Sequence, residues 1–415
     1  MKKDIERLEL LAPAGDYEKL EFAIYYGADA VYMGGPKFGL RAKAGNFDMD
    51  QIQKACEFVH KHGKKIFVTV NIIAHNEDLI DLPEYLLELE KAKVDAIIVS
   101  DPGILLICQE VVPDMEIHLS TQANCTNFMA ANFWHNQGVK RIVLARELSL
   151  VEIRELREKT PLTLDLEGFV HGAMCVSYSG RCLLSSYMTG RDANKGECAH
   201  PCRYRYHLVE EKRPNEYYPV EEDDRGTYIF NSKDMSMVRY IPELVQSGIT
   251  SFKIEGRMKS SSYVAAVVGA YRKAIDAYKK DPDNWEFKEE WQIELDKASH
   301  REFATGFYFG KMGKEGHNYE TSNYVRDYVF VGIVREYDEK TGLAKVEQRN
   351  RILKGDRLEI MDPQDETFGI EVVEMFDAEM APIETAPHPQ MTFYIKLDRK
   401  VRPMAILRRE RKDGE

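Results

Sequence analysis

The chain has 415 residues, of which 44% are hydrophobic and 30% are charged, as is typical of a globular protein. Its 57 basic and 69 acidic residues give a formal net charge of −12, which argues against indiscriminate nucleic-acid binding, because phosphate contacts need a positive surface. No apolar run approaches the roughly 18 residues of a membrane-spanning helix, and the N-terminal segment lacks the apolar core of a signal peptide. We therefore expect a soluble, cytoplasmic protein with no membrane partner and with reduced thiols.

From residue 8 onward, short apolar runs alternate with amphipathic segments. The runs that indicate strands are 8–12, 30–33, 65–72, 96–100, 117–119, 141–144, 162–170, 228–231 and 251–255. The segments between them have helical periodicity, and the last is an amphipathic helix from residue 261 to about residue 278. Strands that alternate with helices favour a parallel sheet, and eight such units close a barrel of about 250 residues. We predict an α/β, TIM-barrel-like (β/α)8 domain, with one of the nine strands spurious or outside the barrel.

The pattern changes near residue 324, where short alternating strands separated by turn residues begin. Five or more such strands favour a small β-barrel. We predict a TIM-barrel-like catalytic domain at 1–280 with a cysteine-rich insertion at 171–226, a wrapping linker at 281–324, and a C-terminal β-barrel domain at 325–415. The sequence leaves open whether this last domain guides RNA, acts as a cover or forms a dimer surface.

Polar residues gather at the predicted carboxyl ends of the barrel strands, which is where such barrels place their chemistry. They are Asn71, Ser120, Thr121, Gln122, Arg146, Glu147, Glu167, His171, Lys253, Glu255 and Arg257. Any one of them could be a helix cap or a salt-bridge partner, and Arg146 could simply pair with Glu147. As a set, they indicate the lining of a pocket.

Lys253, Glu255 and Arg257 alternate along the last predicted strand and should share one face. Two cations on one face suit a dicarboxylate, because arginine can bind a carboxylate through two parallel hydrogen bonds. We predict substrate-binding roles for Gln122, Lys253 and Arg257, and catalytic roles for Arg146, Glu147, Glu167, His171 and Glu255.

Four of the seven cysteines, Cys175, Cys182, Cys198 and Cys202, lie within 28 residues, with the spacing C-x6-C-x15-C-x3-C. Converging thiolates suit an iron–sulfur cluster or zinc. Zinc sites usually have paired C-x2-4-C knuckles, and only the last two cysteines qualify, so the spacing favours a cluster with zinc as the weaker alternative. Four unrelated buried thiols are the remaining interpretation. Between residues 171 and 207, five cations face two carboxylates, which is a local basic patch that an RNA could meet.

The segments E-G-F-V-H-G-A-M-C and G-E-C-A-H-P-C-R, which contain three of these cysteines, resemble the signature of peptidase family U32. Further blocks over most of the chain are similar to that family: L-L-A-P-A-G-D, G-A-D-A-V-Y, L-S-T-Q, A-R-E-L-S and K-I-E-G-R. Within the family, the chain resembles the TrhP (YegQ) branch, which is implicated in prephenate-dependent hydroxylation of the tRNA wobble uridine to 5-hydroxyuridine. Related members hydroxylate ribosomal RNA or, as the UbiU/UbiV pair, a ubiquinone precursor, and this pair carries [4Fe–4S] clusters.

The resemblance implies an RNA-modifying hydroxylase with tRNA as partner, prephenate as co-substrate and a [4Fe–4S] cluster on the four cysteines. Whether three or four of them bind the cluster stays open, as does assembly with itself or a family paralogue. The older label of the family, collagenase-like peptidase, implies hydrolysis instead. The sequence has neither H-E-x-x-H nor G-x-S-x-G, so a peptidase would need Cys56, Cys108 or Cys125 paired with a histidine. A structural zinc-binding RNA adaptor is the third alternative.

Overall fold

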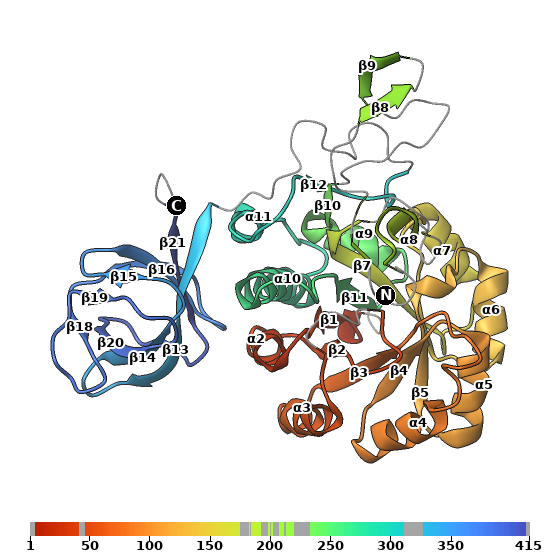
Figure 1. The fold of residues 1–415 in the computed structure, drawn as a ribbon, viewed down its shortest axis with the longest axis horizontal. Coiled ribbons are helices and arrows are strands. Elements are labelled where there is room, and N and C mark those ends of the chain that lie inside the picture. The colour runs from red at the N-terminus through yellow and green to blue at the C-terminus, as the bar shows by residue number, and fades with distance from the viewer. Residues whose placement is uncertain are drawn as a thin grey trace.

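The structure is a computed structural model that describes residues 5–40, 46–174, 182, 184–191, 198–199, 201, 207–210, 213–219, 233–310 and 327–411. A barrel ringed by helices lies beside a C-terminal β-sheet domain (Figure 1). Among the helices of the described ranges, none has both the length and the apolar character needed to span a bilayer.

Eight parallel strands close the barrel. They are β1 (Glu9–Pro13), β2 (Ala30–Gly34), β3 (Lys65–Val70), β4 (Ala96–Val99), β5 (Glu116–Leu119), β6 (Arg141–Val143), β7 (Asp165–Ala173) and β11 (Ser251–Ile254). The first seven pair in chain order, and β11 pairs with both β7 and β1, which completes the circle. The predicted TIM-like barrel is therefore confirmed. The ninth candidate strand, at 228–231, lies outside the described residues.

Helices cover the outside of the barrel (Figure 1). They are α2 (Tyr17–Tyr25), α3 (Met49–Lys61), α4 (Leu82–Lys91), α5 (Pro102–Val111), α6 (Phe128–Asn136), α7 (Leu150–Glu158), α9 (Ile241–Gln246) and α10 (Ser261–Lys280). Several begin at side-chain caps: Asp48 and Ser149 each form a capping box with the third residue of the helix. The apolar faces of these helices pack against the strands in one large core, and a small apolar cluster that includes Tyr32 and Phe67 fills part of the barrel interior.

Several predicted strand boundaries differ from the structure by one to three residues, and two of these differences concern the strands beside the site. The strand predicted to begin at residue 162 begins at Asp165, because residues 162–164 form a turn and bend. The strand predicted to run to residue 255 ends at Ile254, where its register with β7 also shifts. The second difference moves Glu255 and Arg257 from a strand into the loop that follows it.

Strand β7 extends beyond the barrel and pairs there with β10 (Asp234–Ser236), which in turn pairs with β12 (Phe303–Ala304). The cysteine-rich insertion contains α8 (Leu184–Thr189) and a hairpin of β8 (His207–Glu210) and β9 (Arg213–Pro219). Together with α11 (Glu289–Asp296), β12 shows that the segment expected to be a linker has regular structure. It packs on the barrel through the buried Trp291.

The C-terminal domain is a seven-stranded antiparallel sheet in the order β17-β16-β21-β13-β14-β20-β18. Its strands are β13 (Tyr328–Asp338), β14 (Leu343–Gln348), β16 (Arg357–Met361), β17 (Phe368–Glu371), β18 (Met375–Phe376), β20 (Thr392–Lys396) and β21 (Ile406–Glu410), and β15 (Ile352–Leu353) pairs separately with β19 (Thr385–Ala386). Register shifts along β13 bend the sheet into a half-barrel around its own apolar core. The predicted all-β domain is confirmed.

The two domains are fastened together by buried polar contacts. The hydroxyl of Tyr26, which is 1% exposed, donates to the carbonyl oxygens of Met361 at 2.8 Å and Met404 at 3.1 Å. Arg408 pairs with Glu294 of α11 at 2.7 Å. Since an unpaired buried donor is costly, these contacts hold the sheet in one position against the barrel.

Candidate active site

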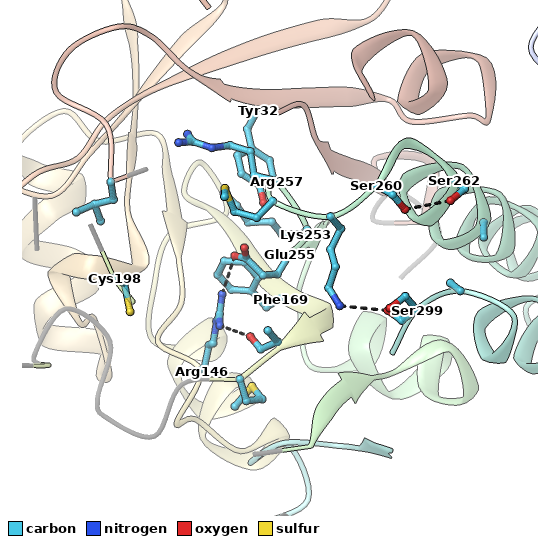
Figure 2. A pocket seen from close by; sticks show the side chains of 18 of the residues that line it. Tyr32, Arg146, Phe169, Cys198, Lys253, Glu255, Arg257, Ser260, Ser262 and Ser299 are labelled. Carbon is cyan, nitrogen blue, oxygen red and sulfur yellow. Dashed lines mark hydrogen bonds and ion pairs between the residues drawn. The ribbon is translucent and has the colours of Figure 1, made fainter. Parts of the chain in front are cut away.

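A cavity of about 810 Å³ opens at the carboxyl ends of the barrel strands. Figure 2 shows it from close by, with Arg146, Lys253, Glu255 and Arg257 around it. Nine of the eleven residues predicted at strand ends line this cavity: Asn71, Ser120, Thr121, Gln122, Arg146, Glu147, Lys253, Glu255 and Arg257. The other two, Glu167 and His171, do not.

Lys253 forms the floor of the cavity. It lies near the end of β11 and is 5% exposed, and its ammonium is 2.8 Å from an oxygen of Glu167. The same nitrogen lies 4.5 Å from the ring centroid of Tyr32 and 5.6 Å from that of Phe169. The ammonium is thus held between two aromatic rings by one buried carboxylate, which fixes a positive charge at the floor.

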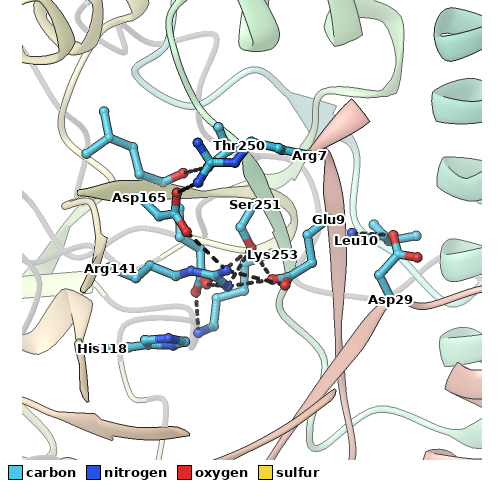
Figure 3. Close-up of polar contacts among 12 residues, drawn as sticks. Arg7, Glu9, Leu10, Asp29, His118, Arg141, Asp165, Thr250, Ser251 and Lys253 are labelled. Atoms are coloured by element: carbon cyan, nitrogen blue, oxygen red, sulfur yellow. Dashed lines mark hydrogen bonds and ion pairs between the residues drawn. The ribbon is translucent and has the colours of Figure 1, made fainter. Parts of the chain in front are cut away.

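Glu167 lies beneath this floor and is completely buried. Besides Lys253, it accepts hydrogen bonds from Arg141 and from the Ser251 hydroxyl, each at 3.2 Å. Figure 3 shows these three donors, Arg141, Ser251 and Lys253, close to one another. Burial favours the neutral acid, but the charges of Lys253 and Arg141 outweigh it and lower the pKa of the Glu167 carboxyl. The prediction that Glu167 is catalytic is therefore corrected: the side chain cannot touch a ligand in the cavity, and it positions Lys253 from below.

One wall of the cavity is an ion pair between Arg146 and Glu255, whose atoms are 3.1 Å apart. Arg146 also donates to the carbonyl oxygen of Ala173 at 2.7 Å and lies over the Phe169 ring, 3.8 Å from its centroid. Gly172 permits this arrangement, because its φ is +104° and an added Cβ would lie 2.4 Å from the Glu255 carbonyl oxygen.

Arg257 closes the opposite side and is 4% exposed. It donates to the Thr69 hydroxyl at 3.5 Å and to the Asn46 side-chain oxygen at 3.3 Å. A Cβ on Gly34 would lie 2.3 Å from its guanidinium, so the glycine makes room for the arginine. Lys253 and Arg257 do not share a strand face as predicted, because the strand ends between them, but both line the cavity.

His171 is 2% exposed and packs among the rings of Tyr263, Tyr271 and Phe303, with centroids 5.3–5.9 Å away. Burial, together with the nearby charge of Lys259, lowers its pKa to about 3, so the imidazole stays neutral. The prediction that His171 is catalytic is corrected, because its side chain does not line the cavity: after a register shift between β7 and β11 it packs against α10 and β12, although its backbone still pairs with Ile254 of β11.

Gln122 belongs to the short 3-10 helix η1 (Thr121–Ala123) that follows β5. The Ser120 hydroxyl caps η1 by accepting from the Gln122 backbone N–H at 3.3 Å, and it also accepts from the Asn71 amide at 3.0 Å. These contacts explain why a Ser-Thr-Gln sequence follows a buried strand, and they fix Gln122 at the cavity edge.

The cysteine-rich insertion meets the same cavity. Cys182 and Cys198 both line it and are partly exposed, while Cys175 and Cys202 lie outside the described residues. Their chain neighbours Met174 and Pro201 also line the cavity. The two described cysteines, and the described residues next to the other two in the chain, therefore border one cavity.

This convergence fits a group held by thiolates. Within the described part of the chain, which holds two of the four cysteines, no three side chains of metal-binding type come together. The backbone N–H of Ala199 donates to the buried Ser185 hydroxyl at 3.0 Å, which ties the Cys198 segment to α8.

The three cysteines outside the insertion do not offer a peptidase nucleophile. Cys56, Cys108 and Cys125 are buried, and none lines the cavity. Burial raises their pKa values to about 12, about 12 and about 11, so the reactive thiolate does not form at neutral pH.

The lining of the cavity is strongly cationic. Among the described residues, seven cations face two carboxylates there, although the whole chain has a net charge of −12. The cations are Arg146, Lys253, Arg257, Lys259, Lys297, Arg408 and Arg411. Such a concentration of charge favours an anionic ligand.

The sequence analysis did not identify three residues of the site. Tyr32 lines the cavity and donates to the carbonyl oxygen of Ile254 at 2.9 Å, and Phe169 packs against both Lys253 and Arg146. Arg141 pairs with Glu167 and with Glu9 below the floor. Strand alternation places Phe169 on the face of Glu167, so that signal was available. The pairing of Arg141 required the closed barrel.

Comparison with known proteins gives consistent results. The model of peptidase family U32 matches residues 15–318, and that of the peptidase family U32 C-terminal domain matches residues 326–408. The chain is 45% identical to tRNA hydroxylation protein P1 of Bacillus subtilis (strain 168), over 97% of this chain and 94% of that protein. It is 38% identical to tRNA hydroxylation protein P of Escherichia coli (strain K12), over 90% and 91% of the two chains. A protein named collagenase from Porphyromonas gingivalis is 32% identical, over 96% of this chain and 97% of that one.

Proposed function

Because the chain belongs to peptidase family U32, we propose that it is an RNA-modifying hydroxylase that converts the wobble uridine of tRNA to 5-hydroxyuridine. We further propose that it uses an iron–sulfur cluster and prephenate as co-substrate. Two relatives that align along most of this chain are named tRNA hydroxylation proteins, which supports the reaction and the class of substrate.

The observation that carries the proposal is the cationic cavity in an acidic protein. An overall charge of −12 repels RNA at long range, so a specific RNA ligand must be met by a local positive surface. The described lining residues include seven cations and two carboxylates, and three of these cations, Lys253, Lys297 and Arg408, are paired with carboxylates behind the lining. The three cysteines outside the insertion are buried and stay protonated, so they do not supply a peptidase nucleophile.

The residues of the cavity have distinct tasks in this proposal. The guanidinium of Arg257 and the ammonium of Lys253 bind the carboxylates of the co-substrate, with the rings of Tyr32 and Phe169 beside them. Glu255, held by Arg146, is the carboxylate that accepts or returns a proton at the reacting base. A cluster held by Cys175, Cys182, Cys198 and Cys202 would supply electron transfer at the edge of the same cavity.

The test is a hydroxylation assay with purified components. Protein prepared without oxygen is incubated with prephenate and with tRNA from cells that lack the modification, and the tRNA is digested to nucleosides for mass spectrometry. We expect 5-hydroxyuridine only when protein, tRNA and prephenate are all present. Absence of the product with a loaded cluster would reject the proposal, and gelatin cleavage by the same preparation would favour the peptidase alternative.

A further inference from the structure

The cavity does not end at the mouth of the barrel. Beyond Arg257 its lining continues along the start of α10, with Lys259, Ser260 and Ser262, and then along residues 297–299. Figure 2 shows Ser260, Ser262 and Ser299 on the side of the cavity away from Arg146. The far wall belongs to the C-terminal domain and consists of Tyr328, Val329, Phe330, Met361, Ile406, Arg408 and Arg411. We call this part the outer cavity.

The wall of the outer cavity is held rigidly. Tyr26 of the barrel bonds to Met361 and Met404, and Arg408 bonds to Glu294 of α11. In Figure 1 the C-terminal domain lies alongside α10 and α11. In this arrangement of the two domains, the wall borders the same cavity as the barrel mouth.

Two of the three cations of the far wall and the adjoining segment are already neutralised. Lys297 pairs with Glu359 at 2.9 Å, and Arg408 pairs with Glu359 at 3.0 Å as well as with Glu294. Both cations also lie over the ring of Tyr328, at 5.2 and 5.5 Å from its centroid. The charges of Lys297 and Arg408 are therefore largely compensated by Glu359 and Glu294, and the main role of both residues is to form the wall.

Arg411 differs from both. It directly follows β21, and its backbone N–H donates to the carbonyl oxygen of Asp327 at 2.7 Å, which anchors the residue at the rim. Its side chain is exposed and forms no ion pair with another described residue. Its charge is therefore available to a ligand that leaves the cavity on this side.

We propose that Arg411 binds a phosphate of the RNA strand next to the target nucleotide, so that the C-terminal domain is part of the RNA-binding site. This inference rests on the proposed function. A cavity of about 810 Å³ lies near the upper end of the range for pockets that hold one small molecule, and it extends past the barrel mouth, as a polymeric substrate requires. A phosphate contact at the rim positions the strand without reading its sequence.

The experiment measures tRNA binding by the full chain at several salt concentrations. We expect Arg411→Ala to weaken binding about three- to tenfold and to reduce the slope of log K against log salt by about 0.7 to 0.9, the value of one phosphate contact. Arg411→Glu should weaken it further. In the hydroxylation assay, Arg411→Ala should raise KM for tRNA more than it lowers kcat, while the affinity for prephenate stays unchanged.

Lys340 provides a matched control in the same domain. It lies in the turn after β13, is exposed and forms no ion pair among the described residues. It lies at the opposite end of β13 from the rim, and that strand spans at most about 33 Å when fully extended. We expect Lys340→Ala to leave both affinity and slope at the wild-type values.

The outcomes distinguish this inference from the proposed function. If wild-type protein hydroxylates tRNA and Arg411→Ala has the same affinity, slope and KM, the inference is wrong while the function stands. It is also wrong if Arg411→Ala weakens binding of prephenate and not of tRNA, because the outer cavity then holds the small anion. If the wild type neither binds nor modifies tRNA, both proposals fail.

Discussion

Replacing Glu167 by glutamine tests whether this carboxylate supports the floor of the cavity. The side chain is completely buried and has three donors within 3.2 Å, two of them cationic. Glutamine keeps the shape but removes the charge, and its amide group then faces Lys253 and Arg141. Removing one partner from a buried ion pair typically costs about 3–5 kcal/mol, because the other charges stay buried. We expect Glu167→Gln to lower the free energy of unfolding by about this amount.

Asp165→Asn is the matched control. Asp165 lies on the same strand, approaches Arg141 at 3.7 Å and pairs with the exposed Arg7 at 2.8 Å, and its own side chain is 26% exposed. Water screens such a pair, so its loss should cost about 1 kcal/mol or less. The three tryptophans, Trp134, Trp285 and Trp291, lie on the barrel helices or pack against them, so their emission in urea follows barrel unfolding.

The pH dependence of this effect has a definite sign. The folded-state pKa of Glu167 is lowered, so its contribution to stability is fully present above the ordinary carboxyl pKa of about 4.3 and is lost as the pH falls through the lowered value. The difference in the free energy of unfolding between the wild type and Glu167→Gln should therefore be constant near neutral pH and become smaller only in acid. The positioning role would be refuted if Glu167→Gln lowered the free energy of unfolding by less than about 1 kcal/mol. It would also be refuted if Glu167→Gln and Asp165→Asn lowered it equally.

The remaining predictions concern the cofactor, the anion site and the peptidase alternative. Protein purified without oxygen should be brown and contain about four irons per chain, and stoichiometric zinc without iron would contradict the cluster. Arg257→Lys keeps the charge but removes the paired hydrogen bonds, so we expect hydroxylation to fall about 10- to 100-fold while cluster content and unfolding stay unchanged. Full activity in that variant would show that Arg257 is not needed to bind the anion, and Arg146 would be the next candidate. Cys125→Ala should not affect hydroxylation, since burial holds that thiol protonated. If the wild type cleaved gelatin and this variant did not, the result would support the peptidase alternative.

The placement of most of the site was accessible from sequence because it follows from local patterns. Apolar runs and helical periodicity recur often enough to require a barrel, and a barrel of parallel strands brings residues at strand ends together. Asn71, Gln122 and Arg146 come from different strands, yet each lines the cavity for this one reason. The cysteine spacing likewise indicated one site before any contact was known.

Tertiary structure decided which of these residues face the cavity. Glu167, Phe169 and His171 alternate on one strand, but the closed barrel places the first beneath the floor and the second beside the cavity. The third still pairs with Ile254 of β11, but the register between the two strands shifts just before it, and its side chain packs against α10 and β12 and not in the cavity.

The position of the C-terminal domain could not be predicted from the sequence either. Its strands could be predicted, but its position against α10 and α11 depends on contacts such as the one between Tyr26 and Met361, which are 335 residues apart. Local periodicity determines which elements form, since it depends on neighbouring residues. The floor and outer wall of the cavity come from long-range packing, which only the folded chain specifies.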